Sequence, residues 1–156
     1  MTIIKQGSLQ TLNRPDKMTD TVKVLTAHGV RPSIQRLAVY QYLKDHPEHP
    51  TVDTLYLALM PSIPTLSKTT VYNTLKLLEE KKLVKSIAIE NDELRYDAET
   101  SEHWHFKCTG CGKIYDIYSD EAKRIRDLTV MSLPKDFKPQ KTEINIRGLC
   151  SDCSAS

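Results

Sequence analysis

SKTTVYNTLKLLEEKKLVKSIAIENDELRYD, residues 67–97, is the stretch that decides the fold of this 156-residue chain. Ser67 is a good helix-capping residue, and apolar side chains follow it at mixed helical spacing, so the stretch predicts a helix over 67–82. LVKSIAIE (83–90) and ELRYD (93–97) are typical of two strands, with a hairpin turn expected at Asn91-Asp92.

Working backwards from Ser67, the sequence predicts three further helices, at about 18–28, 33–44 and 51–59. We expect the buried stripe of the second helix to be formed by Ile34, Leu37, Ala38, Tyr40 and Leu43. Helices followed by a two-stranded hairpin are the pattern of a winged-helix DNA-binding domain. In that arrangement the helix over 67–82 enters the major groove.

After about residue 98 the pattern changes to short strands, expected at 103–107, 113–118 and 142–148, and one helix, expected at 119–132. Apolar residues that we expect on one side of this helix are Ala122, Ile125, Leu128 and Val130 or Met131. The fold class is therefore α+β, with an arm (1–17), a winged-helix domain (18–98) and a small dimerisation and metal-binding domain (99–156). Because residues 99–156 are too few to bury a large core, we expect a bound metal ion and dimerisation to stabilise this domain.

Composition favours an ordinary cytoplasmic protein. The chain has a net charge of +2, no apolar run long enough for a signal peptide, and none that approaches the roughly 18 residues of a membrane span. Residues 1–90 carry 12 Lys and Arg against 8 Asp and Glu, whereas residues 91–156 carry 10 against 12. A mildly basic front half is compatible with binding to DNA there.

All four cysteines lie in two Cys-x-x-Cys pairs, Cys108/Cys111 and Cys150/Cys153. Two intervening residues let both thiolates of a pair reach one ion, and two pairs give the closed tetrahedral shell of a structural zinc site. Disulfides or a redox pair are the alternatives, which a reducing cytoplasm disfavours.

A second set of metal-ligand types surrounds the first cysteine pair. His103 and His105 lie two apart and would share one face of a strand, while Asp97 ends the preceding strand and Asp116 lies on the next. Imidazoles with carboxylates suit Fe(II), Mn(II) or Zn(II). His49 lies in a Pro-rich break, where a histidine is usually only a solvated loop residue, and His28 and His46 are interpreted as surface residues.

Six segments in order resemble the ferric uptake regulator superfamily, whose members are dimeric winged-helix repressors that sense metals. They are GVRPSIQR (29–36), EHPTVDTLY (48–56), LSKTTVYNTLKLLEEKKLV (66–84), RYD (95–97), HWHFKCTGCGKIYD (103–116) and GLCSDC (148–153). The resemblance is strongest to the peroxide-responsive repressors. It implies five ligands for a regulatory Fe2+ or Mn2+, namely His49, Asp97, His103, His105 and Asp116, beside the Zn2+ site.

The resemblance also implies a mechanism. The metal-loaded homodimer binds operator DNA, and metal-catalysed oxidation of His49 or His103 releases it. The run SEHWH and the segment KPQKTEINIRG lack histidines that other branches use, so we expect one regulatory and one structural site per subunit. A repressor for iron, manganese or zinc homeostasis, without peroxide sensing, is the alternative within the superfamily.

Residues expected to contact DNA lie mainly on the helix over 67–82. Tyr72 and Asn73 are placed to read base edges, although Tyr72 could instead pack in the core. Other candidates are Thr69 and Thr70 for the groove and Arg36, Lys68 and Lys76 for phosphates. We expect neither a membrane nor a small-molecule substrate as partner. A metal hydrolase lacks support because there is no His-Glu-x-x-His, and a zinc-stapled interaction module would not explain the winged-helix pattern.

Overall fold

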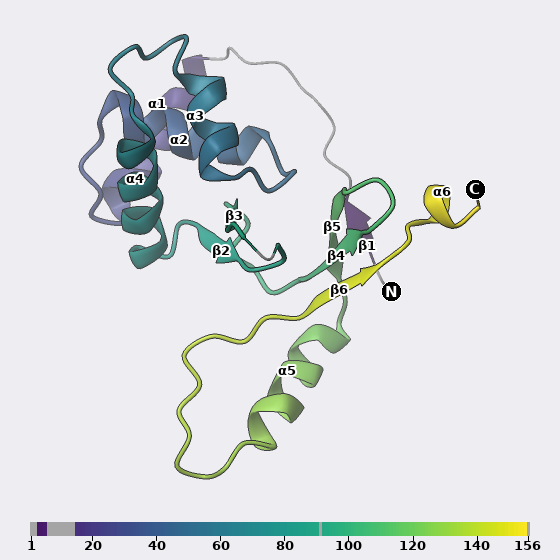
Figure 1. Ribbon diagram of the computed structural model, residues 1–156. Coiled ribbons are helices and arrows are strands. Elements are labelled where there is room, and N and C mark those ends of the chain that lie inside the picture. Colours follow the sequence, from purple (N-terminus) through teal and green to yellow (C-terminus); the bar gives the residue numbers. More distant parts are fainter. Residues whose placement is uncertain (1–2, 6–14, 91, 156) are drawn as a thin grey trace. The chain divides into compact units, whose positions relative to one another are not determined.

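The computed structural model describes residues 3–5, 15–90 and 92–155, and the chain forms two compact units (Figure 1). The first unit lies within residues 7–100 and the second combines the N-terminal strand with residues 101–156. Among the described residues, no helix has the length and apolarity that crossing a bilayer would require.

The first unit packs four helices against a two-stranded hairpin. Its elements are α1 (Pro15–Ala27), α2 (Ile34–Asp45), α3 (Val52–Leu59), α4 (Lys68–Glu80), β2 (Lys85–Ile87) and β3 (Arg95–Asp97). Strands β2 and β3 are antiparallel, which is the expected wing. The predicted turn between them includes Asn91, which lies outside the described residues.

Side-chain caps fix where three of these helices begin. The hydroxyls of Ser33, Thr51 and Ser67 accept the backbone N–H three residues further on, at the starts of α2, α3 and α4 respectively. The sequence therefore placed the starts of these helices correctly, because the capping residue itself forms the boundary.

A single core holds these helices together. Leu25 of α1, Leu55 of α3 and Leu75 of α4 are each fully buried within it. Helix α2 differs from the expected stripe: Val39 is buried, whereas Ile34 is 73% exposed. Ile34 is the first residue of α2, one position after its cap, and no neighbouring element within the described part of the chain covers it.

The second unit is a four-stranded sheet in the order β1-β5-β4-β6. Its elements are β1 (Ile3–Lys5), β4 (Trp104–Cys108), β5 (Ile114–Tyr118), α5 (Glu121–Met131), β6 (Asn145–Gly148) and α6 (Ser151–Ser154). Strand β5 runs antiparallel to both β1 and β4, and β6 runs parallel to β4. Of the central strands, β4 carries His105, with His103 immediately before its first residue, and β5 carries Asp116.

Three features of the chain differ from expectation. The predicted arm includes a strand at Ile3–Lys5 and the start of α1, while its residues 6–14 lie outside the described residues. Helix α6 was not predicted. On α5, only Ala122 is buried, and Leu128 and Met131 of the expected apolar side are 56% and 79% exposed.

Candidate metal centres and nucleic-acid interface

The four cysteines converge within the second unit. Each offers a sulfur, and the four sulfurs lie within 4.8 Å of one another, with Cys111 and Cys150 separated by 3.9 Å. Cys108 is the last residue of β4, Cys150 caps the start of α6, and Cys153 lies within α6. The thiols are free of disulfides in spite of this proximity. The donor set and its closeness fit a tetrahedral Zn2+ held by thiolates.

Backbone donors prepare this cluster for thiolate chemistry. The N–H groups of Cys111 and Cys150 donate to the Cys108 sulfur at 3.5 and 3.3 Å, and these bonds lower the pKa of Cys108 to about 6. The adjacent sulfurs of Cys150 and Cys108 instead raise the pKa of Cys153 to about 12. Four adjacent thiols cannot all ionise unaided, so a bound cation is needed to stabilise the fully deprotonated set.

Close packing joins the two Cys-x-x-Cys turns. Thr109 donates its backbone N–H to the carbonyl of Gly148 at 2.7 Å, which ties the first turn to the end of β6. A side chain on Gly110 would place its Cβ 2.9 Å from the Cβ and 3.0 Å from the sulfur of Cys153. Glycine at position 110 is therefore required for the turns to approach one another.

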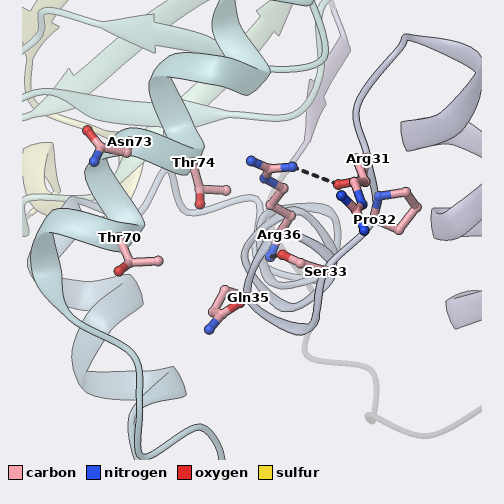
Figure 2. Close-up of a pocket in the computed structure, with 8 residues that line it drawn as sticks. All are labelled: Arg31, Pro32, Ser33, Gln35, Arg36, Thr70, Asn73 and Thr74. Atoms are coloured by element: carbon pink, nitrogen blue, oxygen red, sulfur yellow. Dashed lines mark hydrogen bonds between the residues drawn. The ribbon is translucent and has the colours of Figure 1, made fainter.

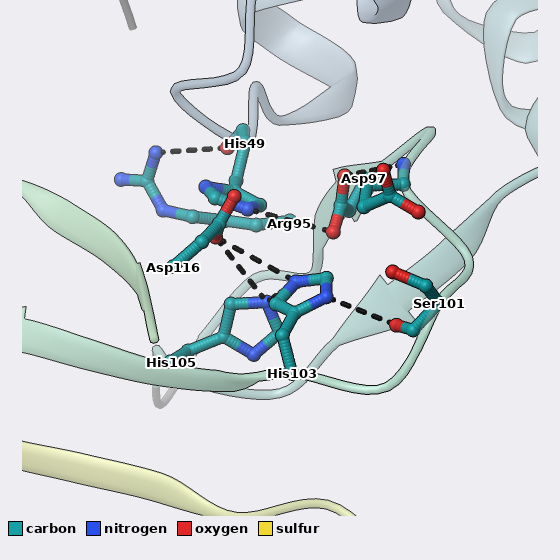
Figure 3. A network of polar contacts seen from close by, with 8 residues as sticks. His49, Arg95, Asp97, Ser101, His103, His105 and Asp116 are labelled. Atoms are coloured by element: carbon teal, nitrogen blue, oxygen red, sulfur yellow. Dashed lines mark hydrogen bonds and ion pairs between the residues drawn. The ribbon is translucent and has the colours of Figure 1, made fainter. Parts of the chain in front are cut away.

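A second group of ligands lies on the sheet of the same unit (Figure 3). The Nε2 atoms of His103 and His105 are 3.0 Å apart, and they lie 3.6 and 3.8 Å from Oδ1 of Asp116. All three side chains are buried. His105 and Asp116 are directly paired across β4 and β5, so strand register brings them together.

The tautomer of His103 suits metal binding. Its Nδ1 lies 3.0 Å from the carbonyl oxygen of Ser101, and its ring packs against Tyr118 with centroids 5.0 Å apart. A proton on Nδ1 that donates to this carbonyl leaves the lone pair of Nε2 directed towards His105 and Asp116.

The remaining two candidate ligands are paired within the first unit. Nε2 of His49 lies 3.6 Å from Oδ2 of Asp97, and both side chains are buried. His49 has a φ of +58°, a left-handed conformation that costs on the order of 1 kcal/mol in a residue with a side chain. Arg95 stabilises this conformation by donating to the His49 carbonyl at 3.2 Å, as Figure 3 shows. The backbone N–H of Glu99 donates to Oδ1 of Asp97 at 2.7 Å and orients that carboxylate.

The His/Asp groups differ chemically from the cysteine cluster. Imidazole nitrogens and carboxylate oxygens fit Fe2+, Mn2+ or Zn2+, and a buried imidazole–carboxylate group is the arrangement such ions use. The sequence predicts one site of thiolates and a separate site of nitrogen and oxygen ligands. In the second unit the cysteines and the His/Asp side chains accordingly form two separate groups.

The surface of α4 carries most of the expected DNA contacts. Tyr72 is 52% exposed, which excludes the alternative that it packs in the core. Asn73, Thr69 and Lys76 are also exposed. Lys68 pairs with Asp53 at 2.8 Å, and with both side chains more than half exposed, this pair is weak enough to exchange for a phosphate.

A cavity of about 520 Å³ lies between the start of α2 and α4; Figure 2 shows the residues that line it. Its lining residues are Arg31, Pro32, Ser33, Gln35, Arg36, Thr70, Asn73 and Thr74. Arg36 donates from Nη1 to the carbonyl of Arg31 at 2.8 Å, which fixes its guanidinium at this cavity. Two guanidinium groups beside a polar helix surface suit an anionic ligand such as a phosphate.

The model of the family described as "Ferric uptake regulator family" matches residues 27–147. The chain belongs to the ferric uptake regulator family. A relative from Bacillus subtilis named peroxide operon regulator is 34% identical over 138 residues, covering 88% of this chain and 94% of the relative. The peroxide-responsive repressor of Staphylococcus saprophyticus is 33% identical over 137 residues, covering 88% and 91%. The crystal structure of the Campylobacter jejuni peroxide stress regulator superposes with a TM-score of 0.60 at 29% identity, covering 90% of this chain and all of that one.

Membership of the ferric uptake regulator family agrees with the resemblance seen in the sequence, but several supporting residues were not predicted. These are Arg31 and Gln35 at the cavity, Arg95 and Ser101 beside the candidate ligands, and Gly110 between the cysteine turns. Arg95 lies within the segment RYD (95–97), yet the carbonyl to which it donates is 46 residues upstream. Of these residues, only Gly110 could have been singled out from the sequence, because a glycine inside Cys-x-x-Cys indicates a tight turn.

Proposed function

We propose that this protein is a metal-dependent, peroxide-responsive transcriptional repressor. The observation that carries the proposal is the presence, at buried positions, of all five nitrogen and oxygen ligands that the resemblance implies. The relatives named as peroxide regulators, each covering most of the chain, support this function over metal homeostasis.

In this proposal His49 and Asp97 join His103, His105 and Asp116 to hold one regulatory ion. Chain connectivity supports it, because Asp97 and His103 are only six residues apart and so lie within about 20 Å of each other however the two units are arranged. Because its ligands come from both units, binding of the ion would be coupled to the arrangement of the winged-helix domains on DNA.

Bound Fe2+ would supply a reductant for hydrogen peroxide beside the imidazoles, whereas Mn2+ would bind without reacting readily. The response of the chain itself is oxidation of His49 or His103: the O–O bond of hydrogen peroxide breaks, one oxygen atom is added to the ring, and the other leaves as water. An oxidised ring is a poorer ligand, so the five-residue set loses affinity for its ion and the two units are no longer held together. The zinc cysteines keep the second unit folded throughout.

We propose that residues 18–98 bind DNA and that residues 99–156 form the homodimer interface. Large exposed apolar side chains in the second unit support an interface there; they are Leu128, Met131, Leu133, Phe137, Ile146 and Leu149. A dimer presents two copies of α4 to successive half-sites of a palindromic operator. Such a repressor acts in the cytoplasm.

The DNA contacts divide by role. Tyr72 and Asn73, with Thr69 and Thr70, would face base edges, and Asn73 can pair with adenine through two hydrogen bonds. Lys68, Lys76 and Arg36 would contact phosphates, so their replacement should weaken binding to all sequences and reduce its salt dependence.

The test is an anaerobic titration of zinc-containing protein with DNA fragments selected by the manganese-loaded form. The protein is loaded with Fe2+ or Mn2+, and binding is measured before and after stoichiometric hydrogen peroxide. We expect loss of binding only in the iron form, with one added oxygen on peptides containing His49 or His103. Peptides containing His28 provide the matched control, since this exposed histidine lies outside the ligand set. Equal persistence of binding in both forms would overturn the peroxide response and leave a metal-homeostasis repressor.

A further inference from the structure

Strand β1 converts the strand that carries Asp116 from an edge strand into an interior one. Ile3, Ile4 and Lys5 pair in register with Tyr118, Ile117 and Asp116 of β5, and β4 pairs with the other side of β5. The sheet order β1-β5-β4-β6 shows that, among the described residues, β1 is what covers this side of β5. The sheet would otherwise end at the strand that presents a candidate ligand.

The register brings β1 against the two β5 positions that matter most for the histidine group. Asp116 lies opposite Lys5 on one side and opposite His105 on the other. Tyr118 lies opposite Ile3, and its ring packs against His103. Through β5, the backbone of β1 therefore supports one ligand directly and a second ligand by way of the Tyr118 ring.

Metal ligands need to be held within about 0.5 Å of their productive positions, and this precision comes from the residues that support them. An edge strand exposes one row of N–H and C=O groups to water and frays more readily than a strand paired on both sides. Pairing with β1 gives β5 a second ladder of backbone partners along Asp116–Tyr118.

We propose that β1 is a positioning strand for the regulatory metal site, and that its docking on β5 and the binding of a divalent ion at His103, His105 and Asp116 stabilise each other. This inference rests on the regulatory site of the proposed function. Because binding free energies are reciprocal, a strand that favours metal binding must itself be docked more firmly when the ion is bound.

The variant that tests this coupling is Ile4→Pro in the full-length, zinc-containing protein. Proline lacks the backbone N–H and holds φ near −65°, so it disrupts a three-residue strand at its centre. Ile4→Val is the matched control, since valine keeps the β-branched side chain that strands favour. A second variant lacking residues 1–5 removes β1 altogether and does not depend on how proline is accommodated.

Two quantities are measured, namely the affinity for Mn2+ by calorimetric titration and the hydrogen exchange of backbone amides. We expect Ile4→Pro and the deletion to weaken Mn2+ binding about ten-fold, the scale typical of residues that support metal ligands. We also expect faster exchange over Ile114–Tyr118, and Mn2+ should slow exchange over Ile3–Lys5 in the unsubstituted protein. Ile4→Val should change none of these.

The inference is overturned if both variants bind Mn2+ as tightly as the unsubstituted protein, whether or not exchange on β5 accelerates. It is also overturned if Mn2+ leaves the exchange of β1 unchanged. Asp116→Ala separates this failure from failure of the proposed function: if that change leaves Mn2+ affinity intact, the ion binds elsewhere and the regulatory site itself is wrong.

Discussion

Gly110→Ala should loosen the zinc site without removing any cysteine. An added Cβ would lie 2.9 Å from the Cβ and 3.0 Å from the sulfur of Cys153, and 3.3 Å from a methyl group of Leu149. Two of these three contacts involve the residue that holds the sulfur, and that residue sits in α6, a helix of only one turn. The strain therefore falls on the ligand.

The expected magnitude follows from these distances. Ordinary van der Waals contact begins at 3.4 Å, so Cys153 has to move by about 0.5 Å to accommodate the methyl group. Zinc–sulfur bonds are about 2.3 Å long and tolerate deviations of only about 0.2 Å. A displacement of this size should reduce zinc affinity by about ten-fold to a hundred-fold, the range seen when residues that position metal ligands are changed.

The assay is competition for zinc by a chromophoric chelator, with native mass spectrometry to count the bound ions. Gly112→Ala is the control in the same loop, because an added Cβ at position 112 meets nothing within 4 Å. Gly112 has a φ of +73°, so alanine there costs on the order of 1 kcal/mol in backbone strain but leaves the sulfurs alone. Unchanged zinc affinity in Gly110→Ala would refute the reasoning. An equal loss of zinc affinity in Gly110→Ala and Gly112→Ala would also refute it, because the loss would then come from backbone strain and not from contact with Cys153.

Three further predictions concern the rest of the molecule. Arg95→Ala removes the hydrogen-bond donor to the carbonyl of His49, whose backbone is in the left-handed conformation. This change should lower the free energy of unfolding by about 1–2 kcal/mol, measured by urea denaturation with Arg95→Lys as the comparison. Burial acts to raise the pKa of Asp45, but hydrogen bonds from Lys17 and Gln41 outweigh it and lower that pKa overall. A lowered carboxyl pKa contributes stability above the unfolded value of about 3.9 and loses it as the pH falls through the folded value. Asp45→Asn should therefore lower the free energy of unfolding by about 1 kcal/mol near pH 7 and by progressively less as the pH falls through the folded pKa. Met131→Glu places a charge on the exposed apolar side of α5 and should convert the proposed dimer to monomers in sedimentation experiments, whereas a dimer that persists would locate the interface elsewhere.

The sequence by itself determined the local structure of the first unit. Ser33, Thr51 and Ser67 mark helix starts because a cap acts on the backbone three residues away, a distance too short for tertiary structure to alter. It also indicated candidate metal ligands, since Cys-x-x-Cys spacing and the alternation of His103 and His105 fix neighbouring side chains directly, whereas His49 entered the set only through the family resemblance.

Only the tertiary structure decided the contacts between distant segments. The pairing of β1 with β5, the reach of Arg95 to the His49 carbonyl and the clash that excludes a side chain at Gly110 each join residues more than 40 positions apart. The burial of α2 and α5 was likewise settled by neighbouring elements, which left Ile34 and Met131 exposed although both are apolar. A periodic pattern indicates which residues share a face of a helix, but whether that face is covered depends on packing, to which segments from the whole chain contribute.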